Sequence, residues 1–305
     1  MDNILFNEEI KMSKSNRLVK IAGIQMKNEI GNKEKNINKA VCMIDKAAKN
    51  GSQIIGLQEL FNTEYVCFCK KDPRTLNCAE SIPGPTIDRI AEKAKEYGIY
   101  IIAPIFEKAA PGLYYNTAAL IGPDGSVIGK QRKTHIPAAL PRDIKKDMGS
   151  LEKLYFRPGN EFHVFKTKLC NIGIIICADG RYPETFRILA LEGAEIIFRP
   201  SAISVSDISK QHNAAERWTM MNITRADDNG VFVVGINRVG VEERCQYYGT
   251  TLIISPYGEI LAKGGEKEDE VVSAIIDLNQ VGRDGRIFRD YRPELYHRLT
   301  NPPKG

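Results

Sequence analysis

YYNTAALIGPDGSVIGK, residues 114–130, has a second version in the same chain, YYGTTLIISPYGEILAK, residues 247–263. The two stretches align without gaps, and both tyrosines, a threonine, an isoleucine, the proline, a glycine and the final lysine coincide. Each predicts a β-hairpin with a Pro-x-Gly turn, because proline and glycine supply the backbone angles of such turns. Unrelated hairpins with this turn also look alike. We favour a duplication, which would make the chain two similar halves.

Short apolar runs alternate with amphipathic stretches along most of the chain, and this alternation predicts an α/β protein. Candidate strands cover residues 19–26, 53–59, 99–108, 115–122, 126–133, 171–177, 195–200, 231–238, 250–255 and 271–277. Candidate helices cover residues 33–49, 85–97, 183–193 and 209–228. If each half forms one sheet, two facing sheets with helices outside give a four-layer α-β-β-α sandwich.

The chain has 305 residues, of which 43% are hydrophobic, so it can bury a large core. No linker-like stretch divides it, and we expect a single domain over residues 19–300 after a flexible leader at residues 1–18. No apolar run is long enough to span a membrane. The net charge of +5 is spread among acids, which argues against a nucleic-acid partner.

Seven cysteines at irregular spacing argue against a disulfide framework and favour a reducing cytoplasm. Three of them cluster at Cys67, Cys69 and Cys78. No C-x2-C pair and no nearby histidine accompanies them, so we expect ordinary loop cysteines and no metal.

Another cysteine, Cys177, ends an apolar run in GIIICADGRYPE, residues 173–184, where the chain leaves the core. It is a candidate nucleophile, and a thiol nucleophile needs a base and donors for an oxyanion. Glu59 closes the apolar strand QIIGLQE and suits a general base, although such a carboxylate can also cap a turn. Lys133 ends another strand, in GKQRKTHIP, and its ammonium would lower the pKa of a neighbouring thiol. Lys130 and Arg132 lie close by, and a Cys–His pair with one of the four histidines is also open.

Taken together, LQELF at 57–61, KQRKTHIP at 130–137 and GIIICADGRYPE at 173–184 resemble the ordered motifs of the nitrilase superfamily of carbon–nitrogen hydrolases. The resemblance extends over residues 19 to 296. It includes three flanking stretches: PGPT at 83–86, YFRPGN at 155–160 and FRDYRPELY at 288–296. The family's fold is the α-β-β-α sandwich that the internal repeat suggests.

The resemblance also implies roles for individual residues. Cys177 attacks a carbonyl or nitrile carbon, and Glu59 takes the thiol proton and later activates water. Lys133 and the backbone N–H of Ala178 hold the oxyanion. Glu152, in LEKLYF, positions the base and the substrate. No cofactor and no metal is required.

Within the family, LEKLYFRPGN and the insertion after HIP are most similar to the enzymes that hydrolyse N-carbamoyl compounds. These act on carbamoyl amino acids, ureidopropionate or carbamoylputrescine, and release ammonia and CO2. Tyr65, Ala178, Arg181 and Ser201 are the substrate-binding residues that the resemblance implies. Arg181 would pair with a substrate carboxylate, unless it forms a structural ion pair with an acid such as Glu184.

Three positions depart from the carbamoyl-hydrolase patterns. Gly180 stands where the D-amino-acid enzymes have an arginine, and Ser150 stands where they have a histidine. Ala178 stands where carbamoylputrescine amidases have an aromatic residue. Aliphatic amides, ω-amides and, less so, nitriles therefore remain alternative substrates.

Other classes of function predict other features. A non-catalytic scaffold of the same fold predicts a damaged Glu–Lys–Cys set, whereas Glu59, Lys133 and Cys177 are all present. A glutaminase half of a synthetase needs an ATP-using domain, and no phosphate-loop motif occurs. A thiol redox protein predicts a C-x-x-C pair, which is absent. The resemblance further implies a homo-oligomer in which residues 183–193 and 209–228 form part of the interface. Plain core packing would give these segments the same apolar stripes.

Overall fold

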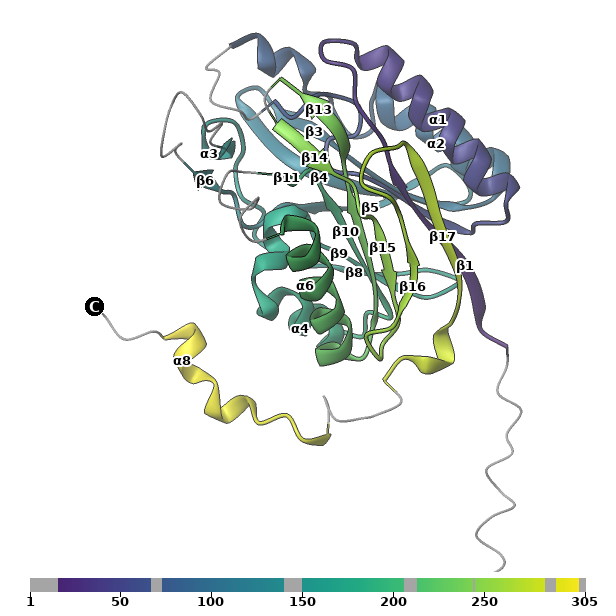
Figure 1. The fold of residues 1–305 in the computed structure, drawn as a ribbon. Helices are drawn as coiled ribbons and strands as arrows, with labels where there is room; N and C mark the ends of the chain where they lie inside the picture. Colours follow the sequence, from purple (N-terminus) through teal and green to yellow (C-terminus); the bar gives the residue numbers. More distant parts are fainter. Residues whose placement is uncertain are drawn as a thin grey trace, which may run out of the picture.

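Two six-stranded sheets lie face to face in a computed structural model of the chain, with helices on both outer sides (Figure 1). The structure describes residues 16–66, 73–139, 150–205, 213–243, 245–282 and 289–301. No helix within these ranges has the length and apolar character needed to cross a membrane.

The first sheet is built mainly from the N-terminal half of the chain. Its strands run in the order β17 (Glu270–Asp277), β1 (Leu18–Gln25), β2 (Ile54–Leu57), β3 (Tyr100–Ala110), β4 (Leu113–Ile121) and β5 (Val127–Arg132). Strands β1, β2 and β3 are parallel, and β4 and β5 continue the sheet as an antiparallel hairpin. The parallel strands end at one edge, where the chain turns towards the site described below.

The second sheet repeats this topology with the C-terminal half. Its strands run in the order β8 (Val164–Lys166), β9 (Asn171–Ile174), β10 (Ile196–Ser201), β12 (Phe232–Asn237), β15 (Leu252–Ile254) and β16 (Ile260–Lys263). Strands β9, β10 and β12 are parallel, and the β15–β16 hairpin follows them. The repeated hairpins of the sequence therefore occupy matching places in the two sheets, and the predicted four-layer sandwich is confirmed.

In the part of the chain that the structure describes, four helices form the two outer layers. Helices α1 (Lys33–Lys49) and α2 (Pro85–Tyr97) cover the first sheet, and α4 (Pro183–Leu191) and α6 (Ala214–Asn229) cover the second (Figure 1). Helix α1 begins where the Asn32 side chain accepts a hydrogen bond from the Lys35 N–H, which is a standard N-cap. The predicted helix at 209–228 begins at Ala214, and residues 206–212 lie outside the described residues.

The central core is apolar and tightly packed between the two sheets. Ile21, Ile54 and Ile102 of the first sheet meet Ile174 and Ile236 of the second, and all are fully buried. The sheets approach so closely that a β-carbon on Gly56 would lie 2.4 Å from the Ile236 side chain. A rigid core of this density fixes the strand ends that carry the site.

Two predicted strands end earlier than their apolar runs suggest. The run at 53–59 leaves the sheet after Leu57, and the run at 171–177 leaves it after Ile174. Glu59 therefore lies in the loop beyond β2, and Cys177 lies beyond β9 at the start of a 3-10 helix. The second copy of the repeat is also split, because Tyr247 lies in β14 (Cys245–Tyr248), outside the second sheet.

Smaller elements lie outside the two large sheets. They comprise β11 (Ser204–Val205), β13 (Val239–Glu242), β6 (Ala138–Ala139), β7 (Ser150–Leu151), α3 (Glu152–Tyr155) and short 3-10 helices at Pro73–Cys78, Cys177–Arg181, Leu278–Gln280 and Pro293–Leu295. Strands β11, β14 and β13 form a three-stranded sheet, and β6 pairs with β7. The 3-10 helix Leu278–Gln280 follows β17 beside the start of β1, where the Leu278 N–H donates a hydrogen bond to the Arg17 carbonyl.

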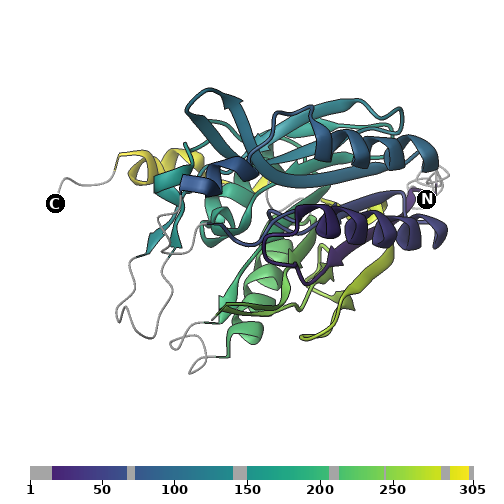
Figure 2. The ribbon, with the colours of Figure 1, turned by 90° about the horizontal axis from the view of Figure 1, so that it is seen from above.

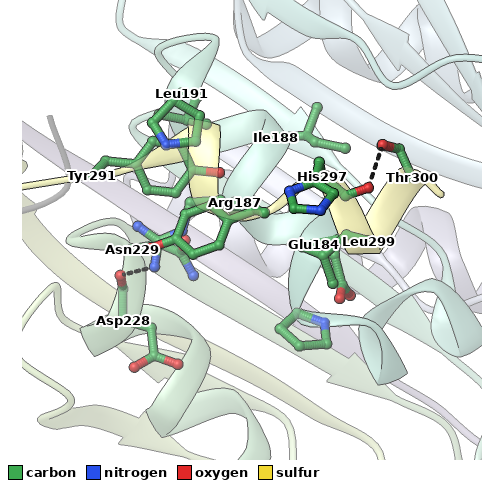
Figure 3. A pocket seen from close by; sticks show the side chains of 13 residues that line it. Glu184, Arg187, Ile188, Leu191, Asp228, Asn229, Tyr291, His297, Leu299 and Thr300 are labelled. Carbon is green, nitrogen blue, oxygen red and sulfur yellow. Dashed lines mark hydrogen bonds between the residues drawn. The ribbon is translucent and has the colours of Figure 1, made fainter. Parts of the chain in front are cut away.

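The C-terminal segment passes beside α4 and ends in α8 (His297–Thr300), far from the start of β1 (Figure 2). A cavity of about 690 Å³ lies between α4, the end of α6 and this segment. Ile188 and Leu191 of α4 line it together with Tyr291 and Leu299 of the segment (Figure 3). None of the predicted site residues is among those that line it.

Candidate active site

Glu59 lies two residues beyond β2 and is completely buried. Its Oε1 accepts hydrogen bonds from Lys133 Nζ at 2.8 Å and from Asn116 Nδ2 at 2.7 Å. Its Oε2 accepts a hydrogen bond from the backbone N–H of Ala202 at 2.8 Å. Donors on both oxygens hold the carboxylate in one orientation, as a positioned base requires.

Lys133 follows the end of β5 and is also completely buried. Its two cationic neighbours, Lys130 and Arg132, instead pair with the buried carboxylate of Glu107, at 2.7 and 2.9 Å. The ambiguity among the three cations of KQRK is thereby resolved. Only the Lys133 ammonium meets Glu59.

Glu152, at the start of α3, lies on the other side of the Lys133 ammonium. Its Oε1 is 2.7 Å from Lys133 Nζ and also accepts a hydrogen bond from the Tyr65 hydroxyl. The same hydroxyl lies 2.9 Å from Ser150 Oγ. A continuous polar chain thus runs from Glu59 through Lys133 and Glu152 to Ser150.

Cys177 opens the 3-10 helix Cys177–Arg181 with a φ of +46°, in the left-handed region that only a minority of non-glycine residues adopt. Its backbone carbonyl accepts hydrogen bonds from Arg199 Nε at 3.3 Å and Nη2 at 3.1 Å. Arg199 is completely buried, and its guanidinium lies 4.5 Å from the Trp218 ring centroid. This arginine therefore fixes the turn on which the thiol sits.

Asp179 joins the cysteine turn to the lysine loop. Its Oδ1 accepts hydrogen bonds from the backbone N–H groups of Thr134 and His135, at 3.2 and 2.7 Å. Its Oδ2 accepts one from the N–H of Ile176 at 3.0 Å. The loops that carry Lys133 and Cys177 are consequently held together by one buried carboxylate.

A buried ion pair, Arg238 with Glu242, holds the loop that carries Glu59. Arg238 Nη2 donates hydrogen bonds to the backbone carbonyls of Glu59, Leu60 and Thr63, at 2.9, 2.9 and 3.1 Å. Glu242 Oε2 accepts one from the Tyr65 N–H at 2.8 Å.

Five residues of the site are not revealed by the sequence motifs: Arg238, Glu242, Asp179, Arg199 and Asn116. Asn116 lies within the repeated stretch, and Asp179 lies two residues after the candidate nucleophile. These two positions were the only features of the sequence that could have pointed to site residues. A buried arginine cannot be told from a surface arginine in a sequence.

The Lys133 ammonium lowers the pKa of the Cys177 thiol, as expected, but the net shift of this pKa is upward. Burial raises the pKa of the Cys177 thiol to about 12, and the negative charge of Glu59 raises it further than the Lys133 ammonium can offset. The resting nucleophile is therefore a thiol and not a thiolate. A base must remove its proton during the attack, and Glu59 belongs to the same charged cluster.

The pKa values of Lys133 and Glu152, the other charged residues of the cluster, are also shifted. Burial alone would lower the pKa of Lys133, but the carboxylates of Glu152 and Glu59 raise it well above its ordinary value. Burial raises the pKa of Glu152 to about 6, although the Lys133 ammonium opposes this change. Lys133 therefore stays a permanent cation, which suits the stabilisation of a negative oxygen.

A cavity of about 780 Å³ opens beside the cluster. Ala178, next to Cys177, and Thr134, next to Lys133, both line it. Arg181 lines it as well, and among the described residues it forms no ion pair, with Glu184 or with any other acid. Tyr182 forms part of the wall, with its ring stacked on His135 at 4.0 Å between centroids.

The structure places the other predicted substrate residues differently. Tyr65 is buried behind Glu152, to which its hydroxyl is bonded. Ser201 is completely buried at the end of β10, and its hydroxyl lies 3.4 Å from the carbonyl of Arg199. The roles of these two residues stay predictions.

No group of three or more His, Cys, Asp or Glu side chains that could hold a metal ion is found in the described part of the chain. Of the clustered cysteines, Cys67 and Cys69 lie outside the described residues, and Cys78 is a half-buried free thiol.

Comparison with known proteins identifies the family of this chain. The family model described as carbon–nitrogen hydrolase matches residues 20–286. An N-carbamoylputrescine amidase of Solanum lycopersicum is 36% identical over 96% of this chain and 100% of its own length. The omega-amidase NIT2 of Xenopus tropicalis is 34% identical over 87% of this chain and 92% of its own. A solved carbon–nitrogen hydrolase from Helicobacter pylori G27 is 30% identical, covers 93% of this chain and 98% of its own, and superposes with a TM-score of 0.83.

Proposed function

This chain belongs to the carbon–nitrogen hydrolase family, and we propose that it hydrolyses a small amide, preferably an N-carbamoyl compound, through a covalent intermediate on Cys177. The observation that carries the proposal is the buried cluster in which the Lys133 ammonium lies 2.8 Å from Glu59 and 2.7 Å from Glu152, beside the Cys177 turn.

The first half of the reaction forms the intermediate. Glu59 removes the thiol proton while the sulfur attacks the carbonyl carbon. The carbonyl oxygen becomes an oxyanion, which the Lys133 ammonium and the N–H of Ala178 stabilise. Glu59 then returns the proton to the departing nitrogen, the C–N bond breaks and ammonia leaves.

The second half releases the product. Glu59 takes a proton from water, and the hydroxyl attacks the thioester carbon. The C–S bond breaks and the proton returns to the sulfur, which regenerates the thiol. An N-carbamoyl substrate gives a carbamic acid, which decomposes to CO2 and the free amine or amino acid; a plain amide gives a carboxylic acid.

The N-carbamoyl class is favoured by the similarity to N-carbamoylputrescine amidases and by the stretch LEKLYFRPGN. An ω-amidase is the second candidate, supported by the similarity to omega-amidase NIT2. Both classes of enzyme use the same Glu–Lys–Cys chemistry, so the catalytic cluster does not distinguish between their substrates. The residues that line the cavity must determine which substrate is accepted.

The test is an assay of ammonia release from a panel of substrates. The panel contains N-carbamoyl-β-alanine, D- and L-carbamoyl amino acids, N-carbamoylputrescine, glutaramate, aliphatic amides and a nitrile. Cys177→Ala and Lys133→Ala proteins run beside the wild type, and both should be inactive while circular dichroism shows an intact fold. Activity that survives in Cys177→Ala would refute the site. Cysteine-dependent activity on plain amides alone would move the assignment to an amidase.

We also propose that the chain forms a homo-oligomer through α4 and α6. Ile188 and Leu191 of α4 and Met220 of α6 are exposed by 38%, 37% and 61%, and they favour a contact between copies. Trp218 of α6 is buried against Arg199, so it is not part of this exposed face. Light scattering of Ile188→Asp, compared with the wild type, tests the proposal; an unchanged mass would contradict it.

A further inference from the structure

Arg199, in β10, is a cation buried without an anionic partner. Its side chain is completely buried, and in the part of the chain that the structure describes it forms no ion pair. Arg238, which is also completely buried, contacts the carboxylate of Glu242 instead. Burying a charge without a counter-charge costs free energy that hydrogen bonds to neutral groups offset only in part. The arrangement therefore points to a use for the charge itself.

Neutral groups contact the guanidinium of Arg199. Its Nη1 donates a hydrogen bond to Asn222 Oδ1 at 3.2 Å, and the Trp218 ring centroid lies 4.5 Å from its central carbon. Asn222 is itself oriented, because its Nδ2 donates a hydrogen bond to the Trp218 carbonyl at 2.8 Å. The backbone carbonyl of Cys177 accepts hydrogen bonds from both Nε and Nη2. Burial lowers the pKa of Arg199 to about 10, so the guanidinium stays protonated at neutral pH.

The Cys177 carbonyl belongs to the same peptide group as the N–H of Ala178. The C–N bond of a peptide has partial double-bond character, so a positive charge bound at the oxygen draws electron density from the nitrogen. The N–H then becomes a stronger hydrogen-bond donor, as in other chains of hydrogen bonds that polarise one another. A charged donor has a larger effect than a neutral one, especially where no carboxylate offsets its field. Arg199 can therefore act on the Ala178 N–H through the peptide group.

We propose that Arg199 is a positioning residue of the oxyanion site: it polarises the Cys177–Ala178 peptide group, so that the Ala178 N–H binds the oxyanion more strongly. The inference rests on the proposed function, which assigns the oxyanion to Lys133 and to this N–H. The charge of Arg199, and not only its hold on the cysteine turn, then contributes to the rate. An interaction with charge that develops only in the transition state lowers the barrier and leaves substrate binding little changed.

Asn222→Asp separates the charge of Arg199 from its hold on the turn. The substitution keeps the shape of the side chain and places a carboxylate against Arg199 Nη1. An ion pair there would hold the guanidinium at least as firmly but would reduce its field at the peptide group. We expect kcat to fall by about tenfold, with KM little changed, on the panel substrate that the wild type hydrolyses fastest. Both halves of the reaction pass through an oxyanion, so kcat reports the effect whichever half is slower.

The matched control is Asn229→Asp, the same substitution on the same helix. The Asn229 side chain donates a hydrogen bond to the Arg225 carbonyl and has no hydrogen bond with Arg199. Its kcat should equal that of the wild type.

Two substitutions of Arg199 compare a charged donor with a neutral one. Arg199→Lys keeps a positive charge, whereas Arg199→Gln keeps only a neutral hydrogen-bond donor. We expect kcat to be about tenfold higher in Arg199→Lys than in Arg199→Gln. Circular dichroism shows whether both proteins fold, and if one does not, Asn222→Asp decides the question.

Labelling of Cys177 by methyl methanethiosulfonate measures the thiol without an oxyanion. The Cys177 sulfur displaces methanesulfinate from the reagent, and no carbonyl oxygen takes part. The labelling rate at fixed pH, followed at Cys177 by mass spectrometry, should change by less than about threefold in the variants whose kcat falls. The same measurement detects any effect of the added carboxylate in Asn222→Asp on the thiol itself.

The outcomes separate this inference from the proposed function. A fall in labelling that matches the fall in kcat would show that Arg199 supports only the thiol, and would overturn the inference. Equal kcat in Arg199→Lys and Arg199→Gln, or wild-type kcat in Asn222→Asp, would overturn it as well. Absence of Cys177-dependent turnover in the wild type, across the whole panel, would instead contradict the proposed function.

Discussion

Arg238, which follows the β12 strand of the second sheet, donates a hydrogen bond of 2.9 Å to the backbone carbonyl of Glu59, which follows β2 of the first sheet. The candidate base is thus held by the opposite half of the molecule. Arg199 of β10 holds the carbonyl of Cys177 within the second half, and Lys133 of the first half completes the charged cluster. Both halves of the repeated fold are required to build one site.

The ion pair between Arg238 and Glu242 should contribute strongly to stability when only one member is removed. Both side chains are buried, so Glu242→Gln leaves an uncompensated guanidinium and should lower the free energy of unfolding by about 3–5 kcal/mol. Urea denaturation measures this loss. The matched control is Arg292→Met in the exposed pair with Glu294, where we expect at most about 1 kcal/mol. Equal effects at both pairs would show that the buried pair has no special role.

Glu59→Gln should make the thiol more acidic while abolishing turnover. The negative charge of Glu59 raises the pKa of Cys177, and the amide removes that charge but leaves Lys133 in place. The rate of alkylation by iodoacetamide, followed against pH by mass spectrometry at Cys177, should therefore rise at lower pH than in the wild type. An unshifted profile would mean that the two groups do not interact, and retained turnover would exclude Glu59 as the base.

The pH dependence of activity should have an acid limb near pH 6. Burial raises the pKa of Glu152 to about 6, and below that value the protonated carboxyl no longer balances the Lys133 charge. The Tyr65 hydroxyl lowers this pKa, so Tyr65→Phe should move the limb to higher pH. Profiles of kcat against pH for both proteins measure the shift. A limb that moves down, or that survives in Glu152→Gln, would assign it to another group.

Gly180→Ala should damage the cysteine turn. A β-carbon at this position would lie 2.1 Å from Arg199 Nε, and Arg199 cannot withdraw without releasing the Cys177 carbonyl. We expect a loss of about 1–3 kcal/mol in unfolding free energy, as for other overpacked sites, together with a lower kcat. Gly265→Ala is the control, because its nearest neighbour, a Glu270 oxygen, lies 3.7 Å from the added carbon. Wild-type kcat in Gly180→Ala would show that Arg199 does not position the nucleophile.

The same contact explains one departure from the carbamoyl-hydrolase pattern. The sequence has Gly180 where D-amino-acid enzymes carry an arginine, and the structure fills that space with the guanidinium of Arg199. Ser150, the other departure from those enzymes, takes part in the polar chain through Tyr65.

The fold could be predicted from local pattern because strand and helix preferences depend on neighbours in the sequence. Helices 33–49 and 85–97 have the predicted bounds, and the repeated hairpins revealed two matching sheets. The exact ends of the strands were harder to predict from the sequence. Apolar residues such as Ile175 and Ile176 continue the run after the strand has left the sheet, since the core also buries the turn.

The sequence by itself determined the layers of the sandwich, because the hydrophobic pattern of each strand and helix is contained in its own stretch of sequence. It also determined the candidate residues Glu59, Lys133, Glu152 and Cys177, because the motifs that contain them are short and occur in a fixed order. Only the tertiary structure decided which charges meet. In the structure, Lys130 and Arg132 form ion pairs with Glu107, and Lys133 forms one with Glu59. Arg199 and Arg238 are buried in the interior. The physical reason is that an ion pair or a raised pKa depends on distance and burial between residues far apart in the chain, and these follow from the packing of two sheets rather than from any single stretch.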